Sequence, residues 1–162
     1  VSTQPLQSKF APDLIRAESL GLQSGNIPTA FSTVRGDRES QRVSQLALLV
    51  HEIHMGLGTA AFPTPINEFG YGLPDCKVTP YWDENPSASV SDDNCKWLLL
   101  ERGGQRMIVL ATWNSEPSEV AIRLKDAPAG ASDADSNEAL QVSNGVLTVP
   151  MKGFGARIIH LK

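Results

Sequence analysis

The chain lacks three features that would define its class immediately. Two cysteines among 162 residues are too few for the dense disulfide scaffold of a small secreted domain. Basic residues do not cluster, and the net charge is −4, whereas nucleic-acid binding needs grouped Lys and Arg to contact phosphates. No apolar run approaches the ~20 residues that cross a bilayer. We therefore expect neither a nucleic-acid partner nor a membrane partner.

The composition that remains is ordinary for a globular protein, with 41% hydrophobic and 20% charged residues. The length allows one domain, alone or with an extra subdomain. The chain begins at Val1 rather than Met, which predicts either a removed signal peptide or excision from a longer protein. We expect an extracellular or periplasmic location. Cys76 and Cys95 then form either one disulfide bond or two buried thiols, and the sequence leaves both open.

The first third of the chain is predicted to be helical and irregular. The strongest predicted helix covers residues 38–55, with weaker ones at residues 12–20 and 65–69. Apolar residues of the strongest helix recur three and four positions apart and form one stripe: Val43, Leu46, Val50 and Ile53. Such helices cannot bury a core of their own. We expect them to pack either on the strands that follow or on protein absent from this chain, and we favour the second.

After Gly72 the apolar period changes from helical to strand-like, with glycine-bearing turns between short segments. Gly103-Gly104 and Asn144-Gly145 predict two-residue hairpins. The predicted strands cover residues 77–82, 87–91, 95–102, 105–113, 119–125, 140–142, 146–149 and 156–161. Residues 126–137 are predicted to be a polar loop. The predicted fold class is thus α+β by content, with a helical segment at residues 1–72 and an antiparallel β-sandwich at residues 73–162.

Several short motifs resemble one enzyme family. Leu48-Leu49-Val50-His51-Glu52-Ile53, followed by Phe69-Gly70 and Pro80-Tyr81-Trp82, is similar to the last part of TIM-barrel glycoside hydrolases of the family 123-like group. Residues 105–115 and 146–161 resemble strands of the accessory sandwich that follows the barrel in those proteins. The resemblance implies that residues 1–72 are the last units of a β/α barrel.

The same resemblance implies a C-terminal fragment or subunit of a carbohydrate-active protein. Its role would be that of a structural accessory sandwich, because no acidic pair matches the two groups that glycoside cleavage needs. The catalytic carboxylates would lie upstream of Val1. The expected partners are a missing N-terminal barrel or another chain, and carbohydrate.

Sugar-contacting candidates lie in both halves of the chain. The resemblance implies contacts from Asn26 and His51, near the substrate-facing rim of a barrel. Tyr81 and Trp82 are further candidates, since pyranose rings stack on exposed aromatic faces, although packing between the two halves is the first interpretation. Asp83-Glu84 is the one adjacent acidic pair beside aromatic residues and is a weak catalytic candidate. Neighbours in a strand point to opposite faces, so only a loop would let the pair act together.

Two patterns suggest metal ligands. His51 and His54 lie three apart on a predicted helix, whereas zinc proteases use a spacing of four. Asp133, Asp135 and Asn137 alternate like the first ligands of a calcium loop, but the glycine and glutamate of that loop are missing at its sixth and twelfth positions. We favour structural or surface roles for all five residues and expect no cofactor.

Two alternatives to the accessory-sandwich hypothesis remain. A stand-alone carbohydrate- or protein-binding module predicts a line of exposed aromatic residues on one sheet. A small metal-dependent hydrolase predicts a metal held by His51 and His54. The accessory hypothesis itself predicts a large exposed apolar patch within residues 10–70.

Overall fold

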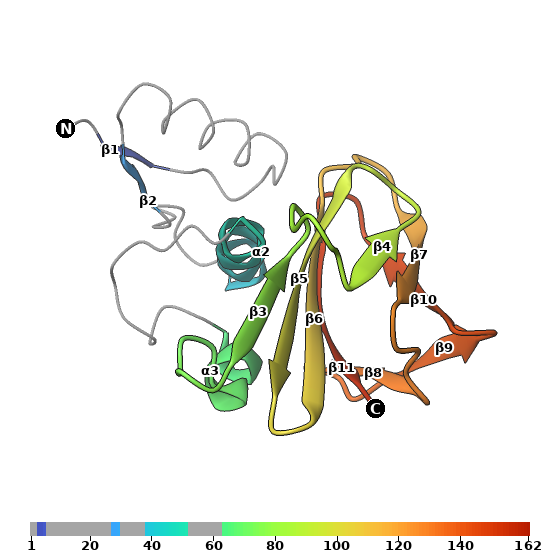
Figure 1. Ribbon diagram of the computed structural model, residues 1–162. Helices are drawn as coiled ribbons and strands as arrows, with labels where there is room; N and C mark the ends of the chain where they lie inside the picture. Colours follow the sequence, from blue (N-terminus) through green and yellow to red (C-terminus); the bar gives the residue numbers. More distant parts are fainter. Residues whose placement is uncertain (1–2, 6–26, 30–37, 52–62) are drawn as a thin grey trace.

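The protein was studied as a computed structural model, which describes residues 3–5, 27–29, 38–51 and 63–162 (Figure 1). The predicted helix at residues 12–20 and the candidates Asn26 and His54 lie outside these ranges. Two short strands, β1 (Thr3–Pro5) and β2 (Ile27–Thr29), pair in parallel. Neither of the described helices is long and apolar enough to cross a membrane.

The rest of the described chain is dominated by one antiparallel sheet of nine strands, in the order β3-β5-β6-β11-β8-β9-β10-β7-β4. Figure 1 shows the sheet curling over, so that its β5–β6–β11 part faces its β10–β7–β4 part. The strands are β3 (Lys77–Pro80), β4 (Ala88–Val90), β5 (Cys95–Arg102), β6 (Gln105–Thr112), β7 (Ser118–Leu124), β8 (Ala131–Asp133), β9 (Ala139–Ser143), β10 (Val146–Met151) and β11 (Ala156–Leu161).

This architecture corrects the predicted fold class. The protein is a mostly antiparallel β half-barrel in which the described helices make up 11% of the chain, so α+β with an N-terminal helical segment is wrong. The two halves of the sheet are joined by β8, which lies inside the predicted loop at residues 126–137. β8 pairs with β11 on one side and β9 on the other, so the ladder never breaks into two separate sheets.

The inner core lies between the two halves of the curled sheet. Alternate residues of β5 point into it, because side chains alternate across a strand. The core combines Trp97, Leu99, Ile108, Leu110 and Ile159 from one half with Val120, Ile122, Leu147 and Val149 from the other. Leu98 and Leu100 of β5 face outward and are also fully buried. Burial on both faces explains why β5 and β6 are continuous apolar runs in the sequence.

Two helices cover the outward face of that half. The helix α2 (Arg38–Leu49) lies against β6 and β11, and α3 (Thr64–Phe69) ends at Gly70, whose left-handed φ of 92° caps it. Leu46, Leu49 and Val50 are fully buried, in one cluster with outward-facing strand residues. These strand residues are Leu98, Leu100, Met107, Val109 and Ile158.

The described part of the apolar stripe is therefore covered by the sheet of this same chain. Burial of each such side chain contributes about 1.5–3 kcal/mol. Our preference for absent protein as the cover of α2 was wrong for these residues, because the outward face of β5, β6 and β11 is itself apolar. Whether residues 1–72 and 73–162 are separate domains stays a prediction.

Candidate functional site

Four side chains gather where β3 ends, β5 begins and β6 ends, and we call them the aromatic patch: Tyr81, Trp82, Lys96 and Trp113. The Tyr81 and Trp82 ring centroids are 4.8 Å apart at an interplanar angle of 88°. The Lys96 ammonium lies 5.1 Å from the Tyr81 centroid and 4.9 Å from the Trp113 centroid. The antiparallel ladders bring these three strand ends to one edge, so residues distant in sequence become neighbours.

The aromatic patch is held from behind by His51, which lies two residues after the end of α2. The His51 Nδ1 lies 3.0 Å from the Tyr81 hydroxyl, and the two rings meet edge to face. Lys96 is also anchored, since its ammonium donates to the Asp93 carbonyl at 2.8 Å. Trp82 stands at the outer end of this assembly and is 49% exposed. The structure thus combines three predicted candidates, His51, Tyr81 and Trp82, in one place.

His51 serves this arrangement as a neutral ring. Burial lowers the pKa of His51, and the nearby Lys96 charge lowers it further. A neutral imidazole can accept a hydrogen bond from the Tyr81 hydroxyl at Nδ1. Its Nε2 is buried and has no hydrogen-bond partner among the described residues. Within the described ranges no three His, Cys, Asp or Glu side chains gather as metal ligands.

A chain of hydrogen bonds runs beside the aromatic patch, and we call it the amide chain. The Trp113 indole N–H donates to Asn94 Oδ1 at 2.6 Å, and Asn94 Nδ2 donates to Asn114 Oδ1 at 2.8 Å. Asn114 Nδ2 in turn donates to Asp92. Sequence reasoning treated Asp92, Asn94 and Asn114 only as turn residues and Trp113 as the end of an apolar strand. The strong β5–β6 hairpin was the available signal, because it places the start of β5 opposite the end of β6.

The acidic candidates next to Trp82 have a local role in the structure. Asp83 Oδ1 accepts the backbone N–H of Asn85 at 2.8 Å, which is the geometry of an Asx turn. Asp83 and Glu84 are both exposed. The Asp83 carboxylate therefore supports the turn that carries Trp82.

The residues of the calcium-like pattern, which we expected in a polar loop, form a tight turn. Asp133 is 7% exposed, and its Oδ1 accepts the backbone N–H groups of Asp135 and Ser136. Its Oδ2 accepts from the Arg157 guanidinium at 2.9 Å. Asp135 pairs with Arg42 of α2, and Asn137 has a left-handed φ of 60°. Both Asp133 oxygens are thus already engaged, and this carboxylate is buried rather than part of a solvated loop.

Burial on its own would raise the pKa of Asp133, but hydrogen bonds from Ser136, Arg157 and Asp135 and the Arg157 charge outweigh it. The net pKa of Asp133 is lowered. The ionised carboxylate therefore stabilises the turn and the β8 ladder beside it.

The two cysteines are free thiols. The β3–β5 register pairs Lys77 with Glu101, so Cys76 lies beside Arg102, at the far end of β5 from Cys95. A separation of roughly 20 Å along the strand is far beyond the ~7 Å Cα distance that a disulfide tolerates. The disulfide interpretation is therefore not supported, and the two-thiol interpretation is.

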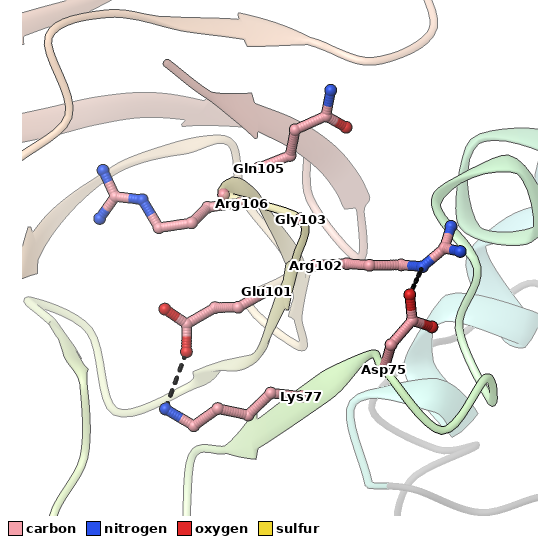
Figure 2. Close-up of a pocket in the computed structure, with 8 residues that line it drawn as sticks. Asp75, Lys77, Glu101, Arg102, Gly103, Gln105 and Arg106 are labelled. Atoms are coloured by element: carbon pink, nitrogen blue, oxygen red, sulfur yellow. Dashed lines mark hydrogen bonds and ion pairs between the residues drawn. The ribbon is translucent and has the colours of Figure 1, made fainter.

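A polar cavity of about 340 Å³ lies at the opposite end of β3, β5 and β6 (Figure 2). Its ionic groups are mutually paired: Lys77 with Glu101 at 3.0 Å and Arg102 with Asp75 at 2.9 Å. Arg106 donates to the Asp126 carbonyl at 2.6 Å. Because these charges satisfy one another, the cavity is a weaker binding candidate than the aromatic patch.

No protein-family model and no curated protein matches this chain. Solved structures that superpose on part of it include the E221Q variant of AmyP in complex with maltotriose. That structure is 10% identical, the superposition covers 46% of this chain and 16% of that chain, and the TM-score is 0.41. A GH27 β-L-arabinopyranosidase from Geobacillus stearothermophilus is 17% identical over 44% of this chain and 18% of that chain, with a TM-score of 0.39. An Anoxybacillus α-amylase is 10% identical over 80% of this chain and 24% of that chain, with a TM-score of 0.41.

These structural neighbours are glycoside hydrolases. The chain spans about a quarter or less of the length of each. TM-scores below 0.5 transfer neither activity nor substrate, and the resemblance to family 123-like proteins stays a prediction.

Proposed function

We propose that this chain is a β-structured accessory domain of a carbohydrate-active protein and that it binds carbohydrate at the aromatic patch. The observation that carries the proposal is the exposed indole of Trp82, which is restrained by its ring contact with Tyr81. A single exposed apolar side chain is unremarkable by itself. Trp82, however, packs on Tyr81, which is held by His51 on one side and by Lys96 on another.

Immobilisation of this kind favours ligand binding. A ligand that stacks on a mobile side chain must restrict it, which costs about 0.5–1.5 kcal/mol. The contacts behind Tyr81 have already removed much of that cost. The flat π face of an indole suits the C–H groups on one face of a pyranose ring.

The polar surroundings also fit a sugar. The exposed Asn94 and the half-buried Asn114 lie next to Trp113, and amide groups both donate and accept hydrogen bonds. In this proposal Asp83 supports a turn and Asp92 orients an amide, so neither performs a catalytic step. The domain binds, and any chemistry belongs to other parts of the protein.

The test compares Trp82→Ala with Leu73→Ala in the full chain. Leu73 is the matched control, because it is 46% exposed and lies before β3, at the far end from the aromatic patch. Binding is measured by retardation in native gels that contain soluble polysaccharides. We expect retardation of the wild type and of the Leu73 variant, and affinity about threefold to tenfold weaker after Trp82→Ala. Equal retardation of both variants, or none of the wild type with any polysaccharide, would contradict the proposal.

A further inference from the structure

We infer that the ligand of the aromatic patch is a neutral, hydroxyl-rich sugar chain and that the amide chain supplies its directed hydrogen bonds. This inference rests on the proposed function, in which Trp82 is the stacking surface. It adds the hydrogen-bonding half of the site and the charge class of the ligand.

The two amides have only one consistent orientation. The Trp113 indole nitrogen can only donate, so the Asn94 atom that faces it must be the oxygen. Asn94 Nδ2 then donates to Asn114 Oδ1, and Asn114 Nδ2 donates to the Asp92 carboxylate, which can only accept. A donor at one end and an acceptor at the other thus exclude a flipped amide anywhere between them.

This orientation determines what the amides can offer a ligand. Each amide has two N–H donors and two acceptor lone pairs, and the amide chain uses one of each. Asn94 and Asn114 therefore each keep one donor and one acceptor at a known place. A hydroxyl group, which donates and accepts at once, matches such a pair. A carboxylate or sulfate only accepts, and it would leave the spare lone pairs facing its own oxygens.

The charges around the site disfavour an anionic ligand as well. Four carboxylates flank the aromatic patch or belong to the amide chain. The Lys96 ammonium lies at the patch and is already held by the Asp93 carbonyl and two rings, and the turn that follows Lys152 packs its backbone on Ser115. The carboxylates are those of Asp83, Glu84, Asp92 and Asp93. Like charges repel across a water-exposed edge, so an acidic polysaccharide is rejected.

The stacking surface and the amide chain lie within reach of one oligosaccharide. The ring of Trp82 contacts that of Tyr81, and Lys96 bridges Tyr81 to Trp113. Joined end to end, these three distances place Trp82 and Trp113 at most about 15 Å apart. A chain of a few sugar units can span that length.

The first experiment measures binding of the full chain to two sets of polymers by native-gel retardation, at low and at moderate salt. The neutral set is soluble starch, glucomannan, arabinoxylan and galactan, and the acidic set is polygalacturonate and alginate. We expect retardation by at least one neutral polymer, insensitive to salt, and none by the acidic polymers. Retardation only by acidic polymers would overturn the inference and leave the proposed function standing. No retardation by any polymer would overturn the proposed function itself.

The second experiment uses the retained neutral polymer and two variants of equal charge. Asn94→Asp removes the amide donors within the amide chain. Asn85→Asp is the control, because it adds the same charge near Trp82 at an exposed residue outside the amide chain. We expect affinity roughly fivefold to tenfold weaker for Asn94→Asp and unchanged for Asn85→Asp.

Equal affinity of both variants would refute the role of the amide chain while Trp82→Ala still tests the stacking surface. If circular dichroism shows that Asn94→Asp does not fold, Trp113→Phe replaces it. That substitution keeps an aromatic ring and deletes the N–H that orients Asn94. The same weakening is expected, and its absence overturns the inference.

Discussion

The buried carboxylate of Asp133 allows a sharp test of how the half-barrel is held together. In Asp133→Asn, the remaining oxygen can still accept the backbone N–H groups of Asp135 and Ser136. The new NH₂ group, however, faces the Arg157 guanidinium, which needs an acceptor. The substitution therefore keeps the volume and the turn and removes one charge-assisted interaction.

The expected loss follows from the burial of the pair. The Asp133 and Arg157 side chains are 9% and 19% exposed, and hydrogen bonds to charged groups contribute about 1.5–3 kcal/mol. Arg157 keeps the Pro150 carbonyl at 3.1 Å and Glu138 at 3.3 Å, so it is not left bare. We expect a loss of about 2–3 kcal/mol in the free energy of unfolding. For a chain of this length that corresponds to a fall of about 4–12 °C in Tm.

The pH dependence gives a second readout with a definite sign. The pKa of Asp133 is lowered in the folded state, so its contribution is present above the unfolded value of about 3.9 and is lost as pH falls through the folded pKa. The free energies of unfolding of wild type and Asp133→Asn, measured in urea, should differ most at neutral pH. They should converge as the pH falls below about 3.9 and through the lowered pKa of the folded state.

The control for this test is Asp135→Asn. It removes the carboxylate charge that pairs with Arg42, and the Asp135 side chain is more exposed than that of Asp133. It should cost at most about 1 kcal/mol. Equal urea midpoints of wild type and Asp133→Asn at neutral pH would refute this account of the turn. A difference in unfolding free energy that persists in acid would refute it as well.

Two further predictions concern backbone packing and thiol chemistry. Gly153→Ala would place a Cβ 2.1 Å from the Ser115 carbonyl oxygen and should destabilise the fold by about 1–3 kcal/mol in thermal unfolding, whereas Gly130→Ala enters open space and should change stability little. Similar Tm values for the two variants would contradict that packing. Burial, together with the Asp92 charge, raises the pKa of Cys95 to about 12. With a thiol reagent at mildly alkaline pH, Cys76 should react in the native protein and Cys95 only after unfolding, and a reductant should leave Tm unchanged. Protein that shows no reactive thiol even after unfolding without a reductant would show that the cysteines are paired after all.

Local structure was largely readable from the sequence. The hairpin of β5 and β6 was predicted with nearly its observed bounds, because Gly103 and Gly104 supply the left-handed φ values of 55° and 77° that its turn requires. The Asn144-Gly145 hairpin was confirmed for the same reason, with φ values of 51° and 75°. α3 was predicted as a single turn ended by Gly70. Such signals are legible because turn geometry depends on a few adjacent residues.

Other features depended on contacts between distant segments. Nothing in the polar sequence around β8 indicates a strand. Asp133 stays buried there only because Arg157, 24 positions later, neutralises it. The aromatic patch and the amide chain likewise arise where three strand ends meet. Along the chain, Tyr81 and Trp82 were already candidates for sugar contacts, whereas the residues of the amide chain looked like separate turns and the end of a strand.

The sequence by itself therefore determined where the chain turns and which residues are apolar. Only the tertiary structure decided that the strands join into one curled sheet and that its outer face covers α2. It also brought Trp82, packed on Tyr81, to the same strand ends as two oriented amides. The physical reason is that turns and periodicity are local properties of the backbone. Burial of a charge, pairing of a polar strand and orientation of an amide depend on partners that only folding brings near.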